Sequence, residues 1–225
     1  MMRQMLCTAL FCLIATTLSG QEPKQTVTPK DWVMRPEAAT AYQKNRVQPL
    51  LQKAIEDATY PIGITNRIKL LFTGVQNNQI LYQASPFYFP RSKTILAHID
   101  YDPQQDKPLL MVFVPSIIDL EKEFVRKGYP RTGFELELAI AFAHEYIHVE
   151  LAAKYPFRLR AVSAVDAKEE AHAWGITILE MVRPALQQNR WLQPSFRLTS
   201  DEFKKVGDNY NHPAWIAAFA NYHGR

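Results

Sequence analysis

The most constraining feature of the chain is the run FELELAIAFAHEYIHVELAAKY, residues 134–155, which contains no helix-breaking residue before Pro156. Most of its residues are apolar or small, and the pattern predicts a buried helix of about 20 residues. Thr132 and Glu135 stand three residues apart at its start, the spacing of a capping box in which the two residues satisfy free backbone N–H groups. Any domain built from this sequence therefore has to enclose one long helix.

Three polar residues, His144, Glu145 and His148, lie in the middle of this apolar run as the motif HExxH. Residues four apart share a helix face, so the two histidines can offer their imidazole nitrogens to one metal ion. Glu145 lies about 100° around the helix. It is placed to act as a general base on a water at the metal rather than as a ligand. A helix this apolar would bury two histidines and a carboxylate at a cost unless they have partners.

Short apolar and β-branched runs separated by Pro, Gly, Asn and Asp precede this helix and predict a small sheet. One or two amphipathic helices, interrupted by Pro49, are predicted upstream of it, between residues 37 and 59. The predicted strands are RIKLLF at 67–72, QILYQ at 79–83, FYF at 87–89, TILAHID at 94–100 and LLMVFV at 109–114.

Two further helices are predicted on either side of the motif helix. The first, SIIDLEKEFVRKG, is expected to be capped by Ser116 and to end at Gly128. The second is expected to begin near Asp166, to include KEEAHAWGITILEMV and to end or bend at Pro184. Short helices are expected in the C-terminal tail.

The N-terminus reads as an export signal, with Arg3 followed by an apolar run of about 14 residues, which is too short to span a bilayer. We expect cleavage near Gly20, a loose leader over residues 21–35, and a single domain over 36–225 in the periplasm or outside the cell. Cys7 and Cys12, the only cysteines, both lie in the signal. No membrane anchor is expected after processing, and a metal site in the mature chain has to use histidines and carboxylates.

Composition narrows the possible functions. The formal net charge is +4, and the basic residues are mixed with acidic ones without a dense basic run, so nucleic-acid binding is not indicated. The eight glycines include no GxGxxG, phosphate-binding loop or GxSxG pattern, which argues against nucleotide-binding proteins and serine hydrolases.

With HExxH preceded by a predicted sheet and followed by a second predicted helix, the chain resembles the zincin metallopeptidases. The resemblance implies an α+β fold in which a small, mostly antiparallel sheet packs on an active-site helix and a backing helix, with Zn²⁺ as cofactor. The metzincin pattern HExxHxxGxxH is excluded, because Leu151 and Lys154 stand where it needs Gly and His. The aspartate-ligand pattern GTxDxxYG is also missing. The gluzincin branch remains. Its third zinc ligand is a glutamate about twenty or more residues downstream of the motif.

The resemblance implies Glu170 as the third zinc ligand, because gluzincins usually have Ala three positions after that glutamate and Ala173 stands there. The alternative is Glu169, but Asp166 and Glu169 have capping-box spacing, which gives Glu169 a structural role. Glu170 shares a helical face with residues 173, 174, 177 and 178, the face expected to pack on the motif helix.

Other positions stay open. Trp174 stands where many gluzincins have an aspartate that orients the first histidine, so no partner for His144 is identified. We expect Trp174, Trp191, Trp215 and Phe219 to belong to the core. His172 points to another helical face than Glu170, and His98 could line a groove. The oxyanion-stabilising residue could be Tyr210, His212, Tyr222 or His223.

The resemblance implies a zinc-dependent peptidase, more an endopeptidase than an exopeptidase, acting on peptides or unfolded protein segments. Zinc would activate a water, Glu145 would accept its proton, and the strand TILAHID would hold the substrate extended by main-chain hydrogen bonds. The alternative is a non-catalytic protein with the zincin fold that captures extended peptides or a protein partner. A helical protein in which HExxH is coincidental is the third possibility.

Overall fold

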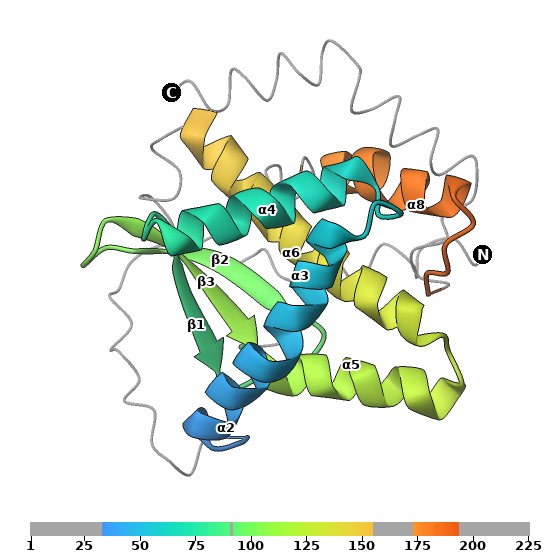
Figure 1. The fold of residues 1–225 in the computed structure, drawn as a ribbon. Coiled ribbons are helices and arrows are strands. Elements are labelled where there is room, and N and C mark those ends of the chain that lie inside the picture. The colour runs from blue at the N-terminus through green and yellow to red at the C-terminus, as the bar shows by residue number, and fades with distance from the viewer. Residues whose placement is uncertain (1–32, 91, 155–172, 194–225) are drawn as a thin grey trace, which may run out of the picture. The chain divides into compact units, whose positions relative to one another are not determined.

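The computed structural model describes residues 33–90, 92–154 and 173–193. All of them belong to the second of the two units of the chain, Met1–Asp31 and Trp32–Arg225. The described elements are α2 (Pro36–Tyr42), the π-helical η2 (Gln43–Val47), α3 (Gln48–Glu56), α4 (Ile62–Gln76), β1 (Leu81–Ser85), β2 (Ala97–Asp102), β3 (Lys107–Phe113), α5 (Val114–Lys127), α6 (Arg131–Lys154), the π-helical η3 (Ile178–Val182) and α8 (Arg183–Gln187) (Figure 1). The α+β class is therefore confirmed.

Within the described residues the sheet has three strands in the order β1-β3-β2, with β3 in the centre. β1 runs parallel to β3, with Leu81 opposite Leu109, and β2 runs antiparallel to it, with Ala97 opposite Val112. The expectation of a mostly antiparallel sheet is wrong, because one of these two pairings is parallel. Only β2 and β3 are joined by a tight turn, in which Asp102 accepts the N–H of Gln104 at 2.8 Å.

Three of the five predicted strands correspond to β1, β2 and β3, and two were wrong. RIKLLF lies inside α4, whose buried residues Ile64, Arg67, Ile68 and Leu71 follow helical spacing. A short apolar run cannot be assigned to a strand or a helix from its own pattern, and the deciding residues lie outside it. FYF forms no strand, and Phe89 contributes only one isolated bridge.

The predicted end of α5 is confirmed, and its predicted start is wrong. Gly128 has φ of 66° and the N–H of Tyr129 bonds to the carbonyl of Phe124 at 2.9 Å, so the left-handed residue closes the last turn. The helix begins at Val114 with Pro115 in its first turn, which leaves Ser116 inside the helix rather than at its cap. Proline suits the first turn because its missing N–H has no partner there.

The long motif helix is confirmed as α6, 24 residues from Arg131 to Lys154. The predicted capping box is wrong, because Thr132 lies within the first turn and Glu135 is bonded elsewhere. Its carboxylate accepts hydrogen bonds from Lys53 at 2.6 Å and Arg131 at 3.1 Å. Glu135 thus connects the start of α6 to α3.

Proline interrupts the helices in the same way at two places. Pro49 follows the π-helical η2 and Pro184 follows the π-helical η3, and each lies in the first turn of the next α-helix. Proline cannot donate to the carbonyl four residues earlier and clashes with it, and a wider π turn relieves both problems. The helix therefore continues past Pro184 to Gln187 instead of ending there.

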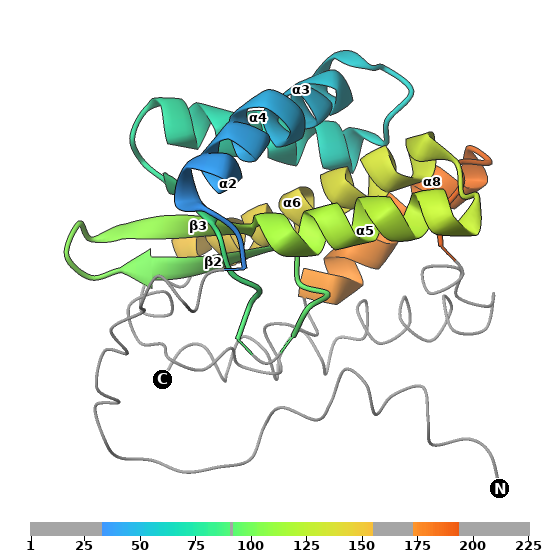
Figure 2. The same ribbon diagram turned by 90° about the horizontal axis from the view of Figure 1, so that it is seen from below.

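α3 and α4 form a layer over α5 and α6, and the sheet extends from one side of α5 and α6 (Figure 2). Buried Arg67 of α4 joins three helical segments: its guanidinium bonds to Glu150 of α6 at 3.1 Å and to Glu180 of η3 at 2.8 Å. A Cβ at Gly63 would lie 2.6 Å from the carbonyl oxygen of Glu180. α4 can therefore approach η3 closely only because that side chain is absent.

Glu137 is a second buried acid on α6. Its two carboxylate oxygens accept hydrogen bonds from the backbone N–H and the side-chain amide of Gln193, both at 2.7 Å. Burial raises the pKa of Glu137 from 4.5 to about 7, although the bonds from Gln193 lower it. Between pH 4.5 and about pH 7, the folded state therefore binds more protons than the unfolded state.

We expect the free energy of unfolding to fall as the pH rises from about 4.5 to about 7 because of this single group, and then to level off. Glu137→Gln should remove this component, which amounts to about 3 kcal/mol at most. Urea unfolding between pH 4.5 and 8 measures it, with the exposed Glu37→Gln as the control for the lost charge. An unchanged pH profile in Glu137→Gln would contradict the assignment.

Candidate functional site

The three motif residues lie in the middle of α6, where the helix is covered on nearly all sides. His144, Glu145 and His148 are 5%, 8% and 8% exposed. Their neighbours Phe142, Ala143 and Ile147 are fully buried. Water therefore satisfies little of the hydrogen-bonding capacity of the motif, and protein groups or a ligand have to supply the rest.

The two histidine rings lie next to each other, as their spacing predicts. Their centroids are 5.1 Å apart and their planes meet at 84°. Two imidazoles bound to one tetrahedral metal ion through bonds of about 2.0 Å would have ring centroids about 5 Å apart. The separation of His144 and His148 thus fits a shared zinc ion.

His144 has a hydrogen-bond partner that the sequence did not identify. Its Nδ1 lies 2.8 Å from Oγ1 of Thr177, and the same hydroxyl donates to the carbonyl of Ala173 at 2.8 Å. A carbonyl can only accept, so the one hydroxyl proton is used there, and Nδ1 of His144 has to be the donor in the other bond. The lone pair of His144 is therefore at Nε2, the nitrogen that could bind a metal.

Trp174 packs against the same ring. The centroids of Trp174 and His144 are 4.5 Å apart, with 35° between the planes. Trp174 is half-buried, and its indole contacts the motif. Ala173 and Thr177 are fully buried. The predicted packing of this helical face against the motif helix is thus confirmed for residues 174 and 177, which both contact His144.

Glu145 faces a different element, the strand β2. Its Oε2 accepts the backbone N–H of Ile99 at 2.8 Å in a buried hydrogen bond. β2 is an edge strand of the described sheet. The carbonyl of Leu96 accepts the N–H of Phe113, so by alternation along the strand the N–H of Ile99 points away from β3. Glu145 makes no further hydrogen bond to the described residues through Oε1. One carboxylate oxygen is thus held, and the other can accept a proton.

Other parts of β2 constrain the surroundings of Glu145. The N–H of Tyr101, two residues along the same edge, is bonded to Oδ1 of Asp100 at 2.7 Å. His98 is half-buried, and its ring lies edge-on to Phe89 with centroids 5.2 Å apart. That His98 lines a groove stays a prediction. Carboxylates therefore occupy the outward N–H groups of Ile99 and Tyr101.

The expected third ligand and the candidate oxyanion-stabilising residues lie outside the described residues. Within 33–90, 92–154 and 173–193, no group of three or more His, Cys, Asp or Glu side chains is placed to hold a metal ion. The positions outside these ranges are Asp166, Glu169, Glu170, His172, Tyr210, His212, Trp215, Phe219, Tyr222 and His223. The predicted export signal, with Cys7 and Cys12, also lies outside them.

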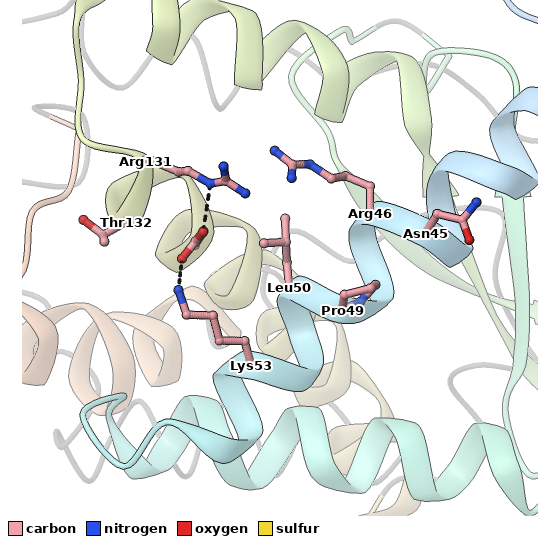
Figure 3. Close-up of a pocket in the computed structure, with 8 residues that line it drawn as sticks. Asn45, Arg46, Pro49, Leu50, Lys53, Arg131 and Thr132 are labelled. Atoms are coloured by element: carbon pink, nitrogen blue, oxygen red, sulfur yellow. Dashed lines mark hydrogen bonds and ion pairs between the residues drawn. The ribbon is translucent and has the colours of Figure 1, made fainter.

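A hollow of about 540 Å³ lies at the start of α6, away from the motif (Figure 3). Its charges are paired: Glu135 lies between Arg131 and Lys53, and Arg46 forms an ion pair with Glu121 of α5. About 13 Å of helix separates Glu135 from His144 at 1.5 Å per residue. We assign this cluster to the packing of η2 on α5 and of α3 on α6. The hollow is lined by Asn45, Arg46, Pro49, Leu50, Lys53, Arg131, Thr132 and Glu135.

No protein-family model, curated protein or solved structure matches the chain. Among the helices of the described residues, none has the length and apolarity needed to cross a membrane.

The bond between Glu145 and Ile99 leads to a prediction that does not involve a metal. Glu145→Ala should leave a buried N–H without an acceptor and lower the free energy of unfolding by about 1–3 kcal/mol. Glu145→Gln keeps an oxygen for this N–H and should cost less. Hydrogen exchange at the Ile99 amide should accelerate in Glu145→Ala and stay slow in Glu145→Gln. Equal exchange in the two variants would show that the bond does not protect this amide.

Proposed function

We propose that the protein is a zinc-dependent peptidase in which His144 and His148 bind the metal and Glu145 is the general base. The observation that carries the proposal is the arrangement of the motif: two adjacent imidazoles with centroids 5.1 Å apart, beside a carboxylate held by the edge of a sheet. The hydrogen bond to Thr177 gives His144 the tautomer that a metal ligand requires.

Glu170 is our candidate for the third ligand. It precedes Ala173, Trp174 and Thr177 by three, four and seven residues, which is the spacing of one helical face. Trp174 and Thr177 both contact His144. A helix that continued toward the N-terminus with the same periodicity would bring Glu170 to this face, whereas Glu169 would point about 100° away.

The proposed reaction is hydrolysis of a peptide bond. Zinc, when bound, acidifies a water and polarises the substrate carbonyl. Oε1 of Glu145 accepts the proton from the water and later returns it to the leaving amine, while Oε2 stays bonded to Ile99. The burial of Glu145 limits competing contact with bulk water, so the carboxylate keeps one orientation. The substrate is an extended peptide or an unfolded protein segment, and we place the protein outside the cytoplasm.

Zinc content and hydrolysis together test this function. Purified protein should hold about one zinc ion per chain, as expected for a three-ligand site. Glu145→Gln should keep the zinc and the fold but lose cleavage of a peptide library, because an amide cannot accept the proton. Glu150→Gln is the matched control, on the same helix but bonded to Arg67.

Absence of zinc after gentle purification, together with no uptake of added zinc, would refute the proposal. The bonds of His144 and Glu145 would then be structural ties like those of Glu135 and Glu137. Zinc binding without cleavage of any library peptide by the parent protein would favour the non-catalytic binding protein. Cleavage at the parent rate by Glu145→Gln would exclude this residue as the base.

Substitution of the two adjacent glutamates in the proposed second helix, Glu169 and Glu170, should have different effects. Glu170→Ala should remove a charged ligand, and both zinc affinity and hydrolysis should fall sharply. Glu169→Ala should remove a capping interaction and lower stability by about 0.5–2 kcal/mol while zinc and hydrolysis persist. Zinc content and melting temperature of the two variants separate the assignments. A zinc-free Glu169→Ala beside a zinc-loaded Glu170→Ala would reverse them.

A further inference from the structure

The hydroxyl of Thr177 is placed where it can act only as an acceptor toward His144. Its proton is donated to the carbonyl of Ala173, one turn earlier, at 2.8 Å. The residue is fully buried, and His144 is 5% exposed, so water does not offer an alternative acceptor for Nδ1. The bond of 2.8 Å between Thr177 and His144 thus selects one neutral tautomer of the imidazole.

Trp174 supplies the other constraint on this ring. It lies against the face of His144, with centroids 4.5 Å apart, while Thr177 bonds in the plane of the ring. The stacked indole limits tilting of the imidazole, and the hydrogen bond limits its rotation about the Cβ–Cγ bond. Both residues lie in one helical segment, residues 173–177. Together they fix the direction in which Nε2 points.

We propose that Thr177 is the positioning residue for the metal ligand His144, with Trp174 holding the ring plane. The inference rests on the proposed function, because it assigns His144 to zinc. A neutral hydroxyl takes the role that a carboxylate often has behind a metal-bound histidine. Thr177 orients the ring and sets its tautomer without adding a negative charge to the buried site. It acts through His144 and does not touch the reacting atoms.

Thr177→Val and Thr177→Ser test the role directly. Valine keeps the shape of threonine and removes the acceptor, whereas serine keeps the hydroxyl. Thr73→Val is the matched control, because Thr73 makes the same bond to the carbonyl four residues earlier, at 2.9 Å, but on the exposed side of α4. Circular dichroism and melting temperature establish that each variant is folded.

Two measurements are made on each folded variant. The ¹⁵N chemical shifts of the His144 ring in metal-free protein report the tautomer. Zinc affinity is measured by competition with a chelator. Thr177→Val should lose the fixed Nδ1–H tautomer and bind zinc about 10–100-fold more weakly. Thr177→Ser should restore both properties, and Thr73→Val should match the parent.

The outcomes separate this inference from the proposed function. If the parent binds zinc and Thr177→Val keeps both the Nδ1–H tautomer and the parent affinity, the positioning role is wrong and the metal site stands. A parent that takes up no zinc overturns the metal site, and with it the assignment of Thr177 to a ligand. The tautomer in Thr177→Val then still decides whether Thr177 controls the ring.

Discussion

The structure depends on how the polar side chains of one buried helix are satisfied. α6 is enclosed on nearly all sides, and an unpaired polar group on such a helix costs about 1–3 kcal/mol. Each acid or histidine with a described hydrogen bond is paired with a different part of the molecule. Glu135 bonds to α3, Glu137 to Gln193, His144 to Thr177, Glu145 to β2, and Glu150 to α4. The hydrogen bonds that these polar side chains require therefore determine which elements surround α6.

The hydrogen bonds of His144 and Glu145 differ from those of Glu135 and Glu137 in how many polar atoms of each side chain they use. Glu135 and Glu137 use both carboxylate oxygens, so their bonds complete their capacity as structural ties. Glu145 uses only Oε2 among the described residues, and the bond of His144 places its lone pair at Nε2. In the proposed mechanism, Oε1 of Glu145 is the proton acceptor and Nε2 of His144 is the nitrogen that would bind the metal. This difference supports a catalytic centre within an otherwise structural row of polar groups.

The sequence predicts the elements with strong local signals and misses those that depend on distant contacts. The length of α6 and the end of α5 at Gly128 follow from the residues themselves. The parallel pairing of β1 with β3 has no local signal, and the short run RIKLLF fits a strand as well as a helix until the flanking buried residues Ile64 and Gly74 are included. The helical spacing of Thr177 could have identified a partner for His144. The N–H of Ile99 could not be found, because every residue except proline has one.

The bond of Glu145 to β2 changes how a substrate could be held. In an antiparallel pair, the N–H and the carbonyl of one residue point to the same side, so the outward groups of β2 belong to Ala97, Ile99 and Tyr101. Two of their N–H groups are occupied, by Glu145 and by Asp100. We therefore expect an extended substrate to donate its own N–H groups to carbonyls of β2 rather than to form a regular antiparallel ladder. Such recognition would leave Glu145 in place, because the substrate would not compete for the N–H that orients this proposed base.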